Sequence, residues 1–407
     1  MSSINILMII ALTLLILLNL PIVWHFSLYL LPAKISSASL RQKPDASIAA
    51  PLRFAVIVCA HNEEAVLGDC LDSIMEMDYP SFQCFVVADN CTDQTAAIAQ
   101  SKGATVFVRN DLRSSKGLAL SYGINRILNQ KIFDAVCIFD SDNLATPDFL
   151  KQLAFFFSQG YDIVCGNRKA SNADSSLISA CYTIYWSMVG NVYGSGHCKQ
   201  GLNAMISGTG FSFRTSALAG GWHTKTFVED IEFYIQASLR GKRIVDAPLA
   251  VYYDQQPETL RTSCIQLRRW TTGNLEIIRA YGKCVLAKLF QKPDAKAFDL
   301  FFFYLLCVNP CGNIICELLL IAAFTGGGLS GDMWILLTII ATYYVFAVIV
   351  GCISARKSGQ LHRHRLPSLL IYPFFIQFLY LMGFSSLLHP VKEWIPIPHR
   401  TIHHRPI

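Results

Sequence analysis

Charged residues are scarce in this 407-residue sequence, in which they make up only 15%, whereas hydrophobic residues make up 53%. A soluble domain usually carries about a quarter charged residues, so the composition argues against a purely soluble protein. It also excludes a disordered chain, because low hydrophobicity and high charge are what keep a chain unfolded. Part of the sequence is therefore expected to lie in a membrane.

The sequence also lacks the short patterns of several well-known sites. Its 14 cysteines form no C-x-x-C pair and no Cys/His spacing typical of zinc. We interpret them as buried small hydrophobes in a reducing compartment. No G-x-G-x-x-G or G-x-x-x-x-G-K-[ST] pattern follows a predicted strand, which argues against a dinucleotide site and a P-loop.

The basic excess of the chain is confined to its end. Residues 354–407 carry seven Lys or Arg residues against one acid, Glu393, which accounts for the whole net charge of +6. Nucleic-acid binding would need a basic face on the folded domain, so no nucleic-acid partner is expected. Basic residues beside apolar segments instead indicate membrane orientation.

Four apolar segments are long enough to cross a bilayer, which takes about 20 residues. They are Ile4–Leu31, Phe301–Phe324, Met333–Ile353 and Leu366–Leu388. The first is too long for a signal peptide and lacks a cleavage site, so we expect a retained anchor. The basic loop at 354–365 predicts that the region between the first two segments is cytoplasmic. Four crossings would leave the basic tail outside, against the rule, unless the last segment is re-entrant.

The second of these segments contains polar residues on one face. Asn309, Asn313 and Glu317 recur at a spacing of four, so they share one side of a helix. Polar groups inside a membrane span are costly and usually face protein or a water-filled path. They either bond to neighbouring helices or line a path for a translocating sugar chain.

A soluble α/β domain is predicted between the anchor and the later segments, over residues 50–258. Its predicted strands are Phe54–Cys59, Cys84–Ala88, Thr105–Val108 and Ala135–Phe139. Helical patterns separate these strands, which is typical of a doubly wound, mostly parallel sheet. Ligands of such sheets bind beyond the carboxyl ends of the strands. Acids that follow the strands are therefore expected to gather there.

The segment Asp140-Ser141-Asp142 is the most informative of these acidic ends. Two carboxylates one residue apart at a strand end can hold Mg²⁺ or Mn²⁺ together with a diphosphate. A solvated turn is the alternative. Farther along, Asp230 opens a helical pattern, where an acid also simply suits the helix dipole. Residues 259–297 form an amphipathic stretch that predicts helices lying at a membrane surface.

Seven motifs in this order closely resemble the membrane-embedded family 2 glycosyltransferases of the cellulose, chitin and hyaluronan synthase group. They are AHNEE, VVADNCTDQT, SKGLAL, FDSDN, GTGFSFR, FVEDIEF and QLRRW. The resemblance covers about residues 50 to 275. One leading and three trailing spans are most similar in layout to the bacterial chitin-oligosaccharide (nodulation) N-acetylglucosaminyltransferases. Two departures are that Ala88 precedes Asp89 and that Val228 opens the family's T-E-D pattern.

The resemblance implies a GT-A fold, a UDP-sugar donor and a Mg²⁺ or Mn²⁺ cofactor. It also implies a role for each matching residue. The implied roles are nucleotide-sugar binding for Glu63, Asp89, Lys116 and Asp140, metal binding for Asp142 with Asp140, general base for Asp230, and acceptor or diphosphate binding for Glu229, Gln266, Arg269 and Trp270. A single displacement with a base and no enzyme nucleophile predicts inversion at the sugar carbon.

The expected organisation has five parts, in a plasma-membrane protein with a cytoplasmic catalytic domain. They are an anchor at 1–33, a GT-A domain at 50–258, interfacial helices at 259–297, an all-α transmembrane region at 298–390 and a basic tail at 391–407. The tail histidines, His389, His399, His403 and His404, could bind a metal, but we interpret them as loose tail composition.

The expected activity is that of an inverting, processive β-glycosyltransferase that extends a polysaccharide or oligosaccharide. The expected partners are the UDP-sugar, a carbohydrate or lipid acceptor and the bilayer; accessory export or regulatory subunits are not identified. The alternative is a single-sugar glycolipid synthase similar to ceramide glucosyltransferases. A non-catalytic membrane protein is a third hypothesis. The sequence does not identify the donor sugar, the linkage or the product length.

Overall fold

The computed structural model describes residues 3–40, 42, 51–111, 115–218, 220–326, 333–392, 395, 397, 399 and 400. The chain divides into two compact units, which are described separately. One unit, the helical unit, comprises residues 1–31, 174–191 and 257–392. The other, the sheet unit, comprises residues 32–173, 192–256 and 393–407. His403 and His404 lie outside the described residues.

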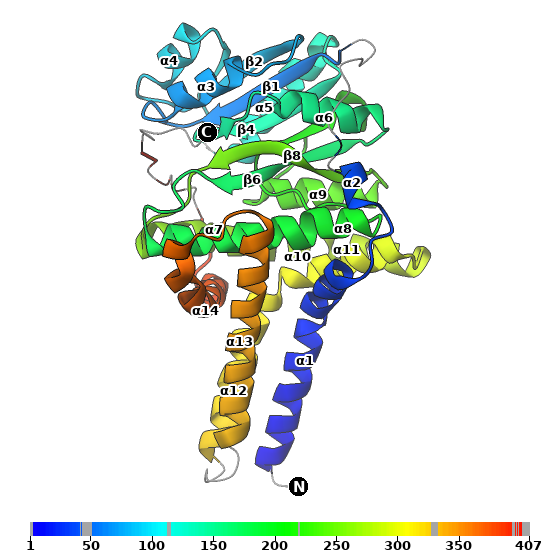
Figure 1. The fold of residues 1–407 in the computed structure, drawn as a ribbon, viewed down its shortest axis with the longest axis vertical. Coiled ribbons are helices and arrows are strands. Elements are labelled where there is room, and N and C mark those ends of the chain that lie inside the picture. The colour runs from blue at the N-terminus through cyan, green and yellow to red at the C-terminus, as the bar shows by residue number, and fades with distance from the viewer. Residues whose placement is uncertain are drawn as a thin grey trace. The chain divides into compact units, whose positions relative to one another are not determined.

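An eight-stranded sheet with the order β3-β2-β1-β4-β7-β6-β8-β5 forms the centre of the sheet unit (Figure 1). The strands are β1 Phe54–Ala60, β2 Phe82–Asp89, β3 Thr105–Arg109, β4 Ala135–Asp140, β5 Leu144–Ala145, β6 Ile163–Ala170, β7 Phe211–Arg214 and β8 Ile244–Asp254. The four strands expected from the sequence are confirmed as β1 to β4, and they pair in parallel. β7 pairs antiparallel with β4 and β6, and β5 pairs antiparallel with β8. The sheet is therefore mixed but mostly parallel.

Helices pack on this sheet through small and apolar residues. They are α2 Ser37–Leu40, α3 Leu67–Met75, α4 Thr95–Ser101, α5 Lys116–Gln130, α6 Phe149–Ser158, α8 His197–Lys199 and α9 Glu229–Leu239. α5 packs on β1 and β2, and α6 packs on β6 and β8. Gly123 permits the first contact, because a Cβ there would lie 2.6 Å from both Ile57 and Val87. All 14 cysteines of the chain are free, and nine are buried, as interpreted from the sequence.

The strand directions fix where a site can form. β6 runs parallel to β8, and β7 runs antiparallel to both β4 and β6, so β6 and β8 point the same way as β4. The carboxyl ends of β1, β2, β4 and β8 therefore share one edge of the sheet. The turn that precedes β7 lies at this edge too. Ligands of open α/β sheets bind there.

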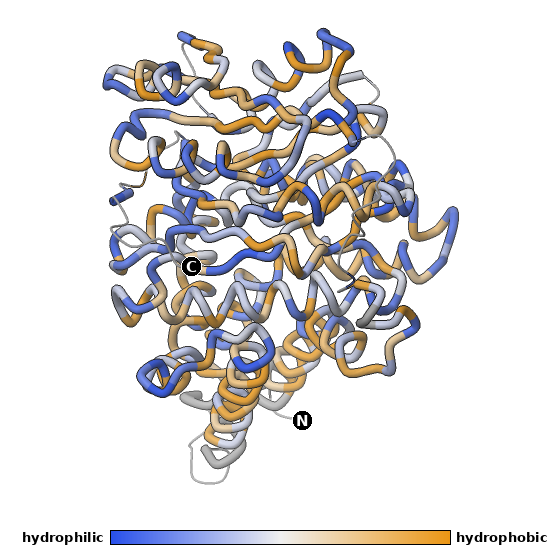
Figure 2. The backbone as a smooth tube through the Cα atoms, turned by 45° about the horizontal axis from the view of Figure 1, so that its top comes forward, coloured by the Kyte–Doolittle hydropathy of each residue, from blue (hydrophilic) through white to orange (hydrophobic). Residues whose placement is uncertain are grey.

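The helical unit contains the apolar helices. They are α1 Ser3–Leu30, α7 Leu177–Val189, α10 Leu260–Gln291, α11 Ala295–Leu306, α12 Asn309–Gly326, α13 Met333–Lys357 and α14 Leu366–Leu388. Three helical stretches are long and apolar enough to cross a membrane. They are Met8–Leu30 in α1, Leu337–Lys357 in α13, and Arg363–Leu388, which contains α14. Figure 2 shows the long helices largely in orange, the hydrophobic colour. The composition thus provides membrane-spanning candidates near both ends of the chain.

The second expected span is not one straight helix. α11 and α12 are bent by 58° at a short break, so the expected segment Phe301–Phe324 is broken, and it counts as a span only if the bent pair is taken together. Pro310 is the second residue of α12. Proline has no N–H to continue the hydrogen-bond ladder and its ring clashes with the preceding turn, but it fits the first turn of a new helix. Residue 310 therefore marks a restart of the helix.

The polar residues of α12 bond to other helices of the same unit. Asn309 donates to the Leu18 carbonyl at 2.7 Å, Asn313 accepts from Asn19 at 2.8 Å, and Glu317 accepts from Gln377 at 2.5 Å. Such bonds satisfy polar groups that would otherwise face lipid. Of the two interpretations of this face, the structure favours helix packing over a lining for a sugar chain.

Candidate functional site

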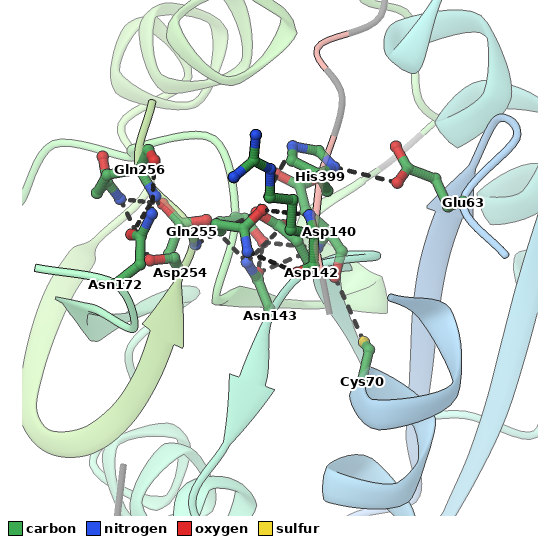
Figure 3. A network of polar contacts seen from close by, with 12 residues as sticks. Glu63, Cys70, Asp140, Asp142, Asn143, Asn172, Asp254, Gln255, Gln256 and His399 are labelled. Atoms are coloured by element: carbon green, nitrogen blue, oxygen red, sulfur yellow. Dashed lines mark hydrogen bonds and ion pairs between the residues drawn. The ribbon is translucent and has the colours of Figure 1, made fainter. Parts of the chain in front are cut away.

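The two aspartates of the D-x-D segment are held at the end of β4 by one asparagine. The Asp140 N–H donates to Asn143 Oδ1 at 3.1 Å and to Thr209 Oγ at 2.8 Å. The Asn143 amide donates to Asp142 at 3.1 Å and to Asp254, the last residue of β8, at 3.0 Å. Figure 3 shows Asp140, Asp142 and Asp254 gathered around Asn143. The segment is a fixed acidic turn and not a loose solvated one.

Lys116 joins this turn to two other elements. It is the first residue of α5, whose start is capped by Ser115. Its Nζ lies 2.5 Å from Asp140 and 3.4 Å from Glu229, and it donates to the Gly208 carbonyl at 2.7 Å. Burial would lower the pKa of Lys116, but the carboxylates of Asp140 and Glu229 raise it, so the side chain stays charged. One ammonium group thus ties β4, α9 and the turn before β7 together.

Two acids stand in the first turn of α9. Burial raises the pKa of Glu229 to about 7, against the lowering effect of Lys116, and Asp230 adds to the rise. Burial also raises the pKa of Asp230, while Lys116 and the backbone N–H groups at the start of α9 lower it. A carboxylate with a raised pKa is a better proton acceptor than an ordinary one. The role of Asp230 as general base stays a prediction.

A second acidic pair lies across the turn. Burial and the neighbouring Asp254 carboxylate raise the pKa of Asp142 to about 7. The Gln255 N–H donates to Asp142 at 3.3 Å, and the Gln256 side chain donates to Asp254 at 2.8 Å. Buried carboxylates that face each other in this way favour a bound cation.

Arg168 is a site residue that the sequence did not reveal. It projects from β6, donates through Nε to the Tyr252 hydroxyl at 3.0 Å, and donates through Nη2 to the Ser207 carbonyl. The following turn approaches Tyr252 closely, because a Cβ on Gly210 would lie 2.1 Å from the Tyr252 ring. Gly210 also has a φ of +64°. Arg168 and Lys116 therefore bind successive carbonyls, those of Ser207 and Gly208, in the turn before β7.

The acids after β1 and β2 have partners of their own. Asp89 is buried and forms an ion pair with Arg109 at 2.5 Å. The Arg109 side chain also reaches Asp111 at 3.0 Å. The His61 ring bonds to the Asp89 carbonyl at 2.6 Å. Asp89 is thus fixed by Arg109, a residue from the end of β3 that sequence reasoning missed.

The tail residue His399 lies in this site, which corrects its interpretation as loose composition. Its Nδ1 bonds to Glu63 Oε2 at 3.0 Å, and its Nε2 lies 3.8 Å from Asp142 Oδ2 (Figure 3). Burial would lower the pKa of His399, but Asp142 and Glu63 raise it to about 9. No local signal could have identified His399, because 336 positions separate it from Glu63.

The predicted site residues of the QLRRW motif are Gln266, Arg269 and Trp270, and all three belong to α10, in the helical unit. The Trp270 ring meets the Trp186 ring edge to face, with centroids 5.7 Å apart. Gln266 Oε1 is buried without a hydrogen-bond partner among the described residues. Arg269 is one position before Trp270. The joint action of these residues with Asp230 stays a prediction.

The donor set at the sheet edge fits a divalent cation that binds through oxygen. Asp140, Asp142 and Asp254 converge there, and the cationic groups that balance them are Lys116, Arg168 and His399. Mg²⁺ and Mn²⁺ typically use one or two carboxylates plus substrate phosphates. Asp142 would hold such an ion, with Asp140 beside it.

Comparisons with known proteins agree with this geometry. Residues 51–273 match the family model described as "Glycosyltransferase like family 2". The chain is 28% identical over 264 residues to the probable glycosyltransferase YdaM of Bacillus subtilis (strain 168), covering 62% of this chain and 61% of that protein. It is also 28% identical over 269 residues to the poly-beta-1,6-N-acetyl-D-glucosamine synthase of Staphylococcus aureus (strain COL), covering 65% and 63% of the two chains. The chain thus spans a little over three fifths of the length of these relatives.

A solved structure extends the likeness of the fold to nearly the whole chain. The mannosyltransferase PcManGT from Pyrobaculum calidifontis, solved with GDP-Man and Mn²⁺, matches with a TM-score of 0.59 at 18% identity. The match covers 94% of this chain and 99% of that one. The sequence predicted a GT-A domain with a mostly parallel sheet followed by apolar helices, and this fold class is confirmed.

Proposed function

Because the chain belongs to the family 2 glycosyltransferases, we propose that it transfers sugars from a UDP-sugar to a growing polysaccharide or oligosaccharide at a membrane. The transfer inverts the configuration of the sugar carbon. The observation that carries this proposal is the convergence of Asp140, Glu229 and Asp230 around Lys116 at one edge of the sheet, with Asp142 beside Asp140.

The donor is bound where the strands end. The acidic turn of Asp140 and Asp142 would hold a divalent cation, and Lys116 adds a fixed positive charge beside Asp140. Asp89 and Glu63, at the ends of β2 and β1, face the nucleotide part of the donor. A divalent cation held there would supply electrostatic stabilisation for the leaving diphosphate.

Asp230 acts as the base in a single displacement. The acceptor hydroxyl oxygen forms the new bond to the anomeric carbon while its proton passes to the Asp230 carboxylate. The bond between that carbon and the UDP oxygen breaks, and UDP leaves with the electron pair. Lys116 stabilises the charge that develops on the leaving group. Attack opposite the leaving group converts an α-linked donor sugar into a β-linked product.

The acceptor is bound by α10. Trp270 offers a flat apolar ring to a terminal sugar, and the buried Gln266 Oε1 is an acceptor atom that a sugar hydroxyl can satisfy. Arg269 and Glu229 complete the acceptor and diphosphate contacts that we propose. A buried polar atom without a partner costs about 1–3 kcal/mol, which a bound sugar recovers.

The position of the tail supports a proposal for the membrane topology. His399 contacts Glu63, so the tail and the sheet unit lie on the same side of the membrane, which we propose to be the cytoplasm. The chain between them then crosses an even number of times. This favours the re-entrant alternative, in which either the bent α11–α12 pair or α14 does not cross.

The product is proposed from the relatives. The likeness to the poly-beta-1,6-N-acetyl-D-glucosamine synthase of S. aureus supports a processive polymerase. For the same reason, UDP-N-acetylglucosamine is the first donor to test. The fold likeness to a mannosyltransferase crystallised with GDP-Man and Mn²⁺ leads us to include GDP-mannose in the screen.

The test is a donor screen with product mass analysis. Purified full-length protein is incubated with labelled UDP-N-acetylglucosamine, UDP-glucose or GDP-mannose and with Mn²⁺ or Mg²⁺. We expect a ladder of products from one UDP-sugar, and transfer that is about 10²–10⁴-fold slower in Asp230→Asn. Asp78→Asn is the matched control, because Asp78 is an exposed partner of Lys151. Absence of transfer from every donor would contradict the proposal.

A single-sugar glycolipid synthase is the second candidate. It is favoured by the polar residues of α12, which bond to α1 and α14 and leave less support for a sugar path. It predicts one product, extractable into organic solvent, that carries a single added sugar. A ladder of longer, water-soluble products would exclude it.

A further inference from the structure

Three apolar helices of the helical unit have neighbouring ends. The stretches Leu337–Lys357 and Arg363–Leu388 are joined by residues 358–362 alone, and the third stretch is Met8–Leu30. Lys357, at the end of α13, lies over the ring of Tyr29, near the end of α1, with its Nζ 4.3 Å from the ring centroid. The ends of α1 and α13 and the start of α14 therefore meet at one boundary of the apolar region.

The loop between α13 and α14 is held in place by hydrogen bonds. The Asn191 side chain of α7 donates to the Ser354 carbonyl at 3.0 Å and to Ser358 Oγ at 2.9 Å. The Arg365 guanidinium donates to the Gln360 carbonyl at 3.1 Å and to Gln360 Oε1 at 2.9 Å. The basic side chains of this loop are therefore carried by a backbone of defined shape.

The positive charge around this loop is balanced only in part. Asp174 accepts from Arg365 Nε at 2.5 Å and from Arg365 Nη2 at 2.7 Å, and it contacts His364 Nε2 at 2.8 Å. Three other cations are exposed and form no ion pair with an acid within the part of the chain that the structure describes: Arg356, Lys357 and Arg363. Three unbalanced positive charges so close in the sequence attract an anion.

A buried hydroxyl lies beside these cations. Tyr29 Oη is buried and has no hydrogen-bond partner among the described residues. Buried hydroxyl groups are normally hydrogen-bonded, so this one calls for a partner. Because the Lys357 ammonium lies over the same ring, Tyr29 can donate a hydrogen bond to an anionic oxygen that the ammonium also attracts.

Exposed apolar side chains flank the same cations. Leu30, next to Tyr29, is 75% exposed, and Leu366, three residues after Arg363, is 49% exposed. Apolar side chains at the ends of such helices are suited to contact acyl chains. A ligand that joins a phosphate to long apolar chains satisfies both kinds of surface, and a phospholipid has this chemistry. A soluble phosphate would leave the apolar part uncovered.

We propose that Arg356, Lys357 and Arg363, with the Tyr29 hydroxyl, bind the phosphate of an anionic phospholipid at the membrane surface. The site belongs to the helical unit and does not depend on the proposed function. Clusters of Lys and Arg beside a membrane span bind anionic lipids, and each cation strengthens the attraction about 5-fold. Because the site draws on α1, α13 and the loop before α14, a bound lipid holds these helices together.

The experiment is native mass spectrometry of the delipidated full-length protein in detergent, titrated with phosphatidylglycerol or with phosphatidylcholine. The two lipids carry the same acyl chains, so the comparison isolates the net charge of the headgroup. We expect the wild type to bind the first phosphatidylglycerol about 10-fold or more tightly than the first phosphatidylcholine. The triple variant Arg356→Gln/Lys357→Gln/Arg363→Gln should lose this preference. Tyr29→Phe removes one oxygen, keeps the ring beneath Lys357, and should weaken phosphatidylglycerol binding about 5-fold.

The matched control replaces three exposed cations of the sheet unit, Lys131, Lys225 and Arg240, by glutamine. It lowers the net charge by the same amount and should keep the wild-type preference. Thermal unfolding of each variant shows whether it folds, and Tyr29→Phe tests the site if the triple variant does not.

Three results would count against this lipid site. Equal binding of the two lipids by the wild type, or the same preference in the triple variant and the control, would overturn the proposal. Displacement of the bound lipid by millimolar glycerol phosphate would overturn it as well, because the site would then take a soluble phosphate. An unchanged phosphatidylglycerol affinity in Tyr29→Phe would overturn the assignment of its hydroxyl.

Discussion

Replacing Lys116 by methionine removes the one ammonium group that links Asp140 and Glu229. The Lys116 side chain is 21% exposed, that of Glu229 9% and that of Asp140 32%. Removing one partner of a buried ion pair costs about 3–5 kcal/mol, and removing an exposed one costs less than about 1 kcal/mol. Because the site is mostly but not fully buried, we expect a loss of about 3 kcal/mol in the free energy of unfolding at pH 8.

The loss should depend on pH in a defined direction. The pKa of Glu229 is raised from 4.5 to about 7 with Lys116 present, and removing the ammonium raises it further. An acid whose pKa is raised in the folded state contributes stability below its unfolded pKa, and this contribution disappears as the pH rises through the folded pKa. The destabilisation by Lys116→Met should therefore be smaller at pH 5, where only the contact with Asp140 is lost, and grow above pH 7, where the contact with an ionised Glu229 is lost as well.

The assay is thermal unfolding of the full chain in detergent with a metal chelator present. For a unit of about this size, 3 kcal/mol corresponds to a fall in Tm of roughly 6–12 °C. Lys102→Met is the matched control, since the Lys102–Asp72 pair is 37% and 35% exposed and should change Tm little. Equal losses for the two variants, or a loss at Lys116 that is the same at pH 5 and pH 8, would refute the reasoning.

Three further predictions test the base, the turn and the tail. Asp230→Asn should lower transfer by about 10²–10⁴-fold while UDP affinity, measured by calorimetry, changes little, because the base acts on the acceptor hydroxyl; retained transfer would place the base elsewhere. Gly210→Ala should lower the free energy of unfolding, measured by chemical denaturation, by about 3 kcal/mol, since its Cβ would lie 2.1 Å from the Tyr252 ring. The control is Gly103→Ala, which has a φ of +83° but open space around it and should lower the free energy of unfolding by about 1 kcal/mol. Equal losses would show that the close approach to Tyr252 does not restrict position 210. Protease added to inverted membrane vesicles should remove a C-terminal epitope tag together with the sheet unit, and protection of the tag alone would contradict the topology that we derive from His399.

The acids at the strand ends were predictable because of a property of parallel sheets. The carboxyl ends of parallel strands share one edge, so Glu63, Asp89 and Asp140 had to approach one another once the strands were identified. Short apolar β-branched runs identified those strands, and β1 to β4 follow them closely. The contact of Lys116 with Asp140 needed the three-dimensional structure, but the motif SKGLAL indicated the residue.

Other site residues were not predictable because they come from the strands beyond β4, whose pairing order the sequence does not reveal. β7 and β8 complete the sheet beyond β4, and their pairings place Arg168, Tyr252 and Asp254 against the D-x-D turn. None of these residues belongs to a motif, and the sequence around each of them is typical of an ordinary strand. Periodicity along the chain carries no information on which distant strand pairs with which.

The break between α11 and α12 was missed for a different reason. Hydropathy treats Asn309 and Pro310 as two weak positions within an apolar run, so it predicts one continuous span. Backbone chemistry treats Pro310 as a residue that cannot continue a helix but can begin one. The resulting 58° bend shows that the second criterion prevails here.

The charges at the sheet edge explain why three cations come from three separate elements. Lys116 from α5, Arg168 from β6 and His399 from the tail each approach a different carboxylate, Asp140, Asp254 and Asp142. Buried carboxylates without such partners would take up protons rather than remain ionised. A divalent cation and the diphosphate of a donor roughly neutralise each other, so the pair can enter without upsetting this balance. Lys116 and Arg168 can then keep their contacts with the Gly208 and Ser207 carbonyls when the donor binds.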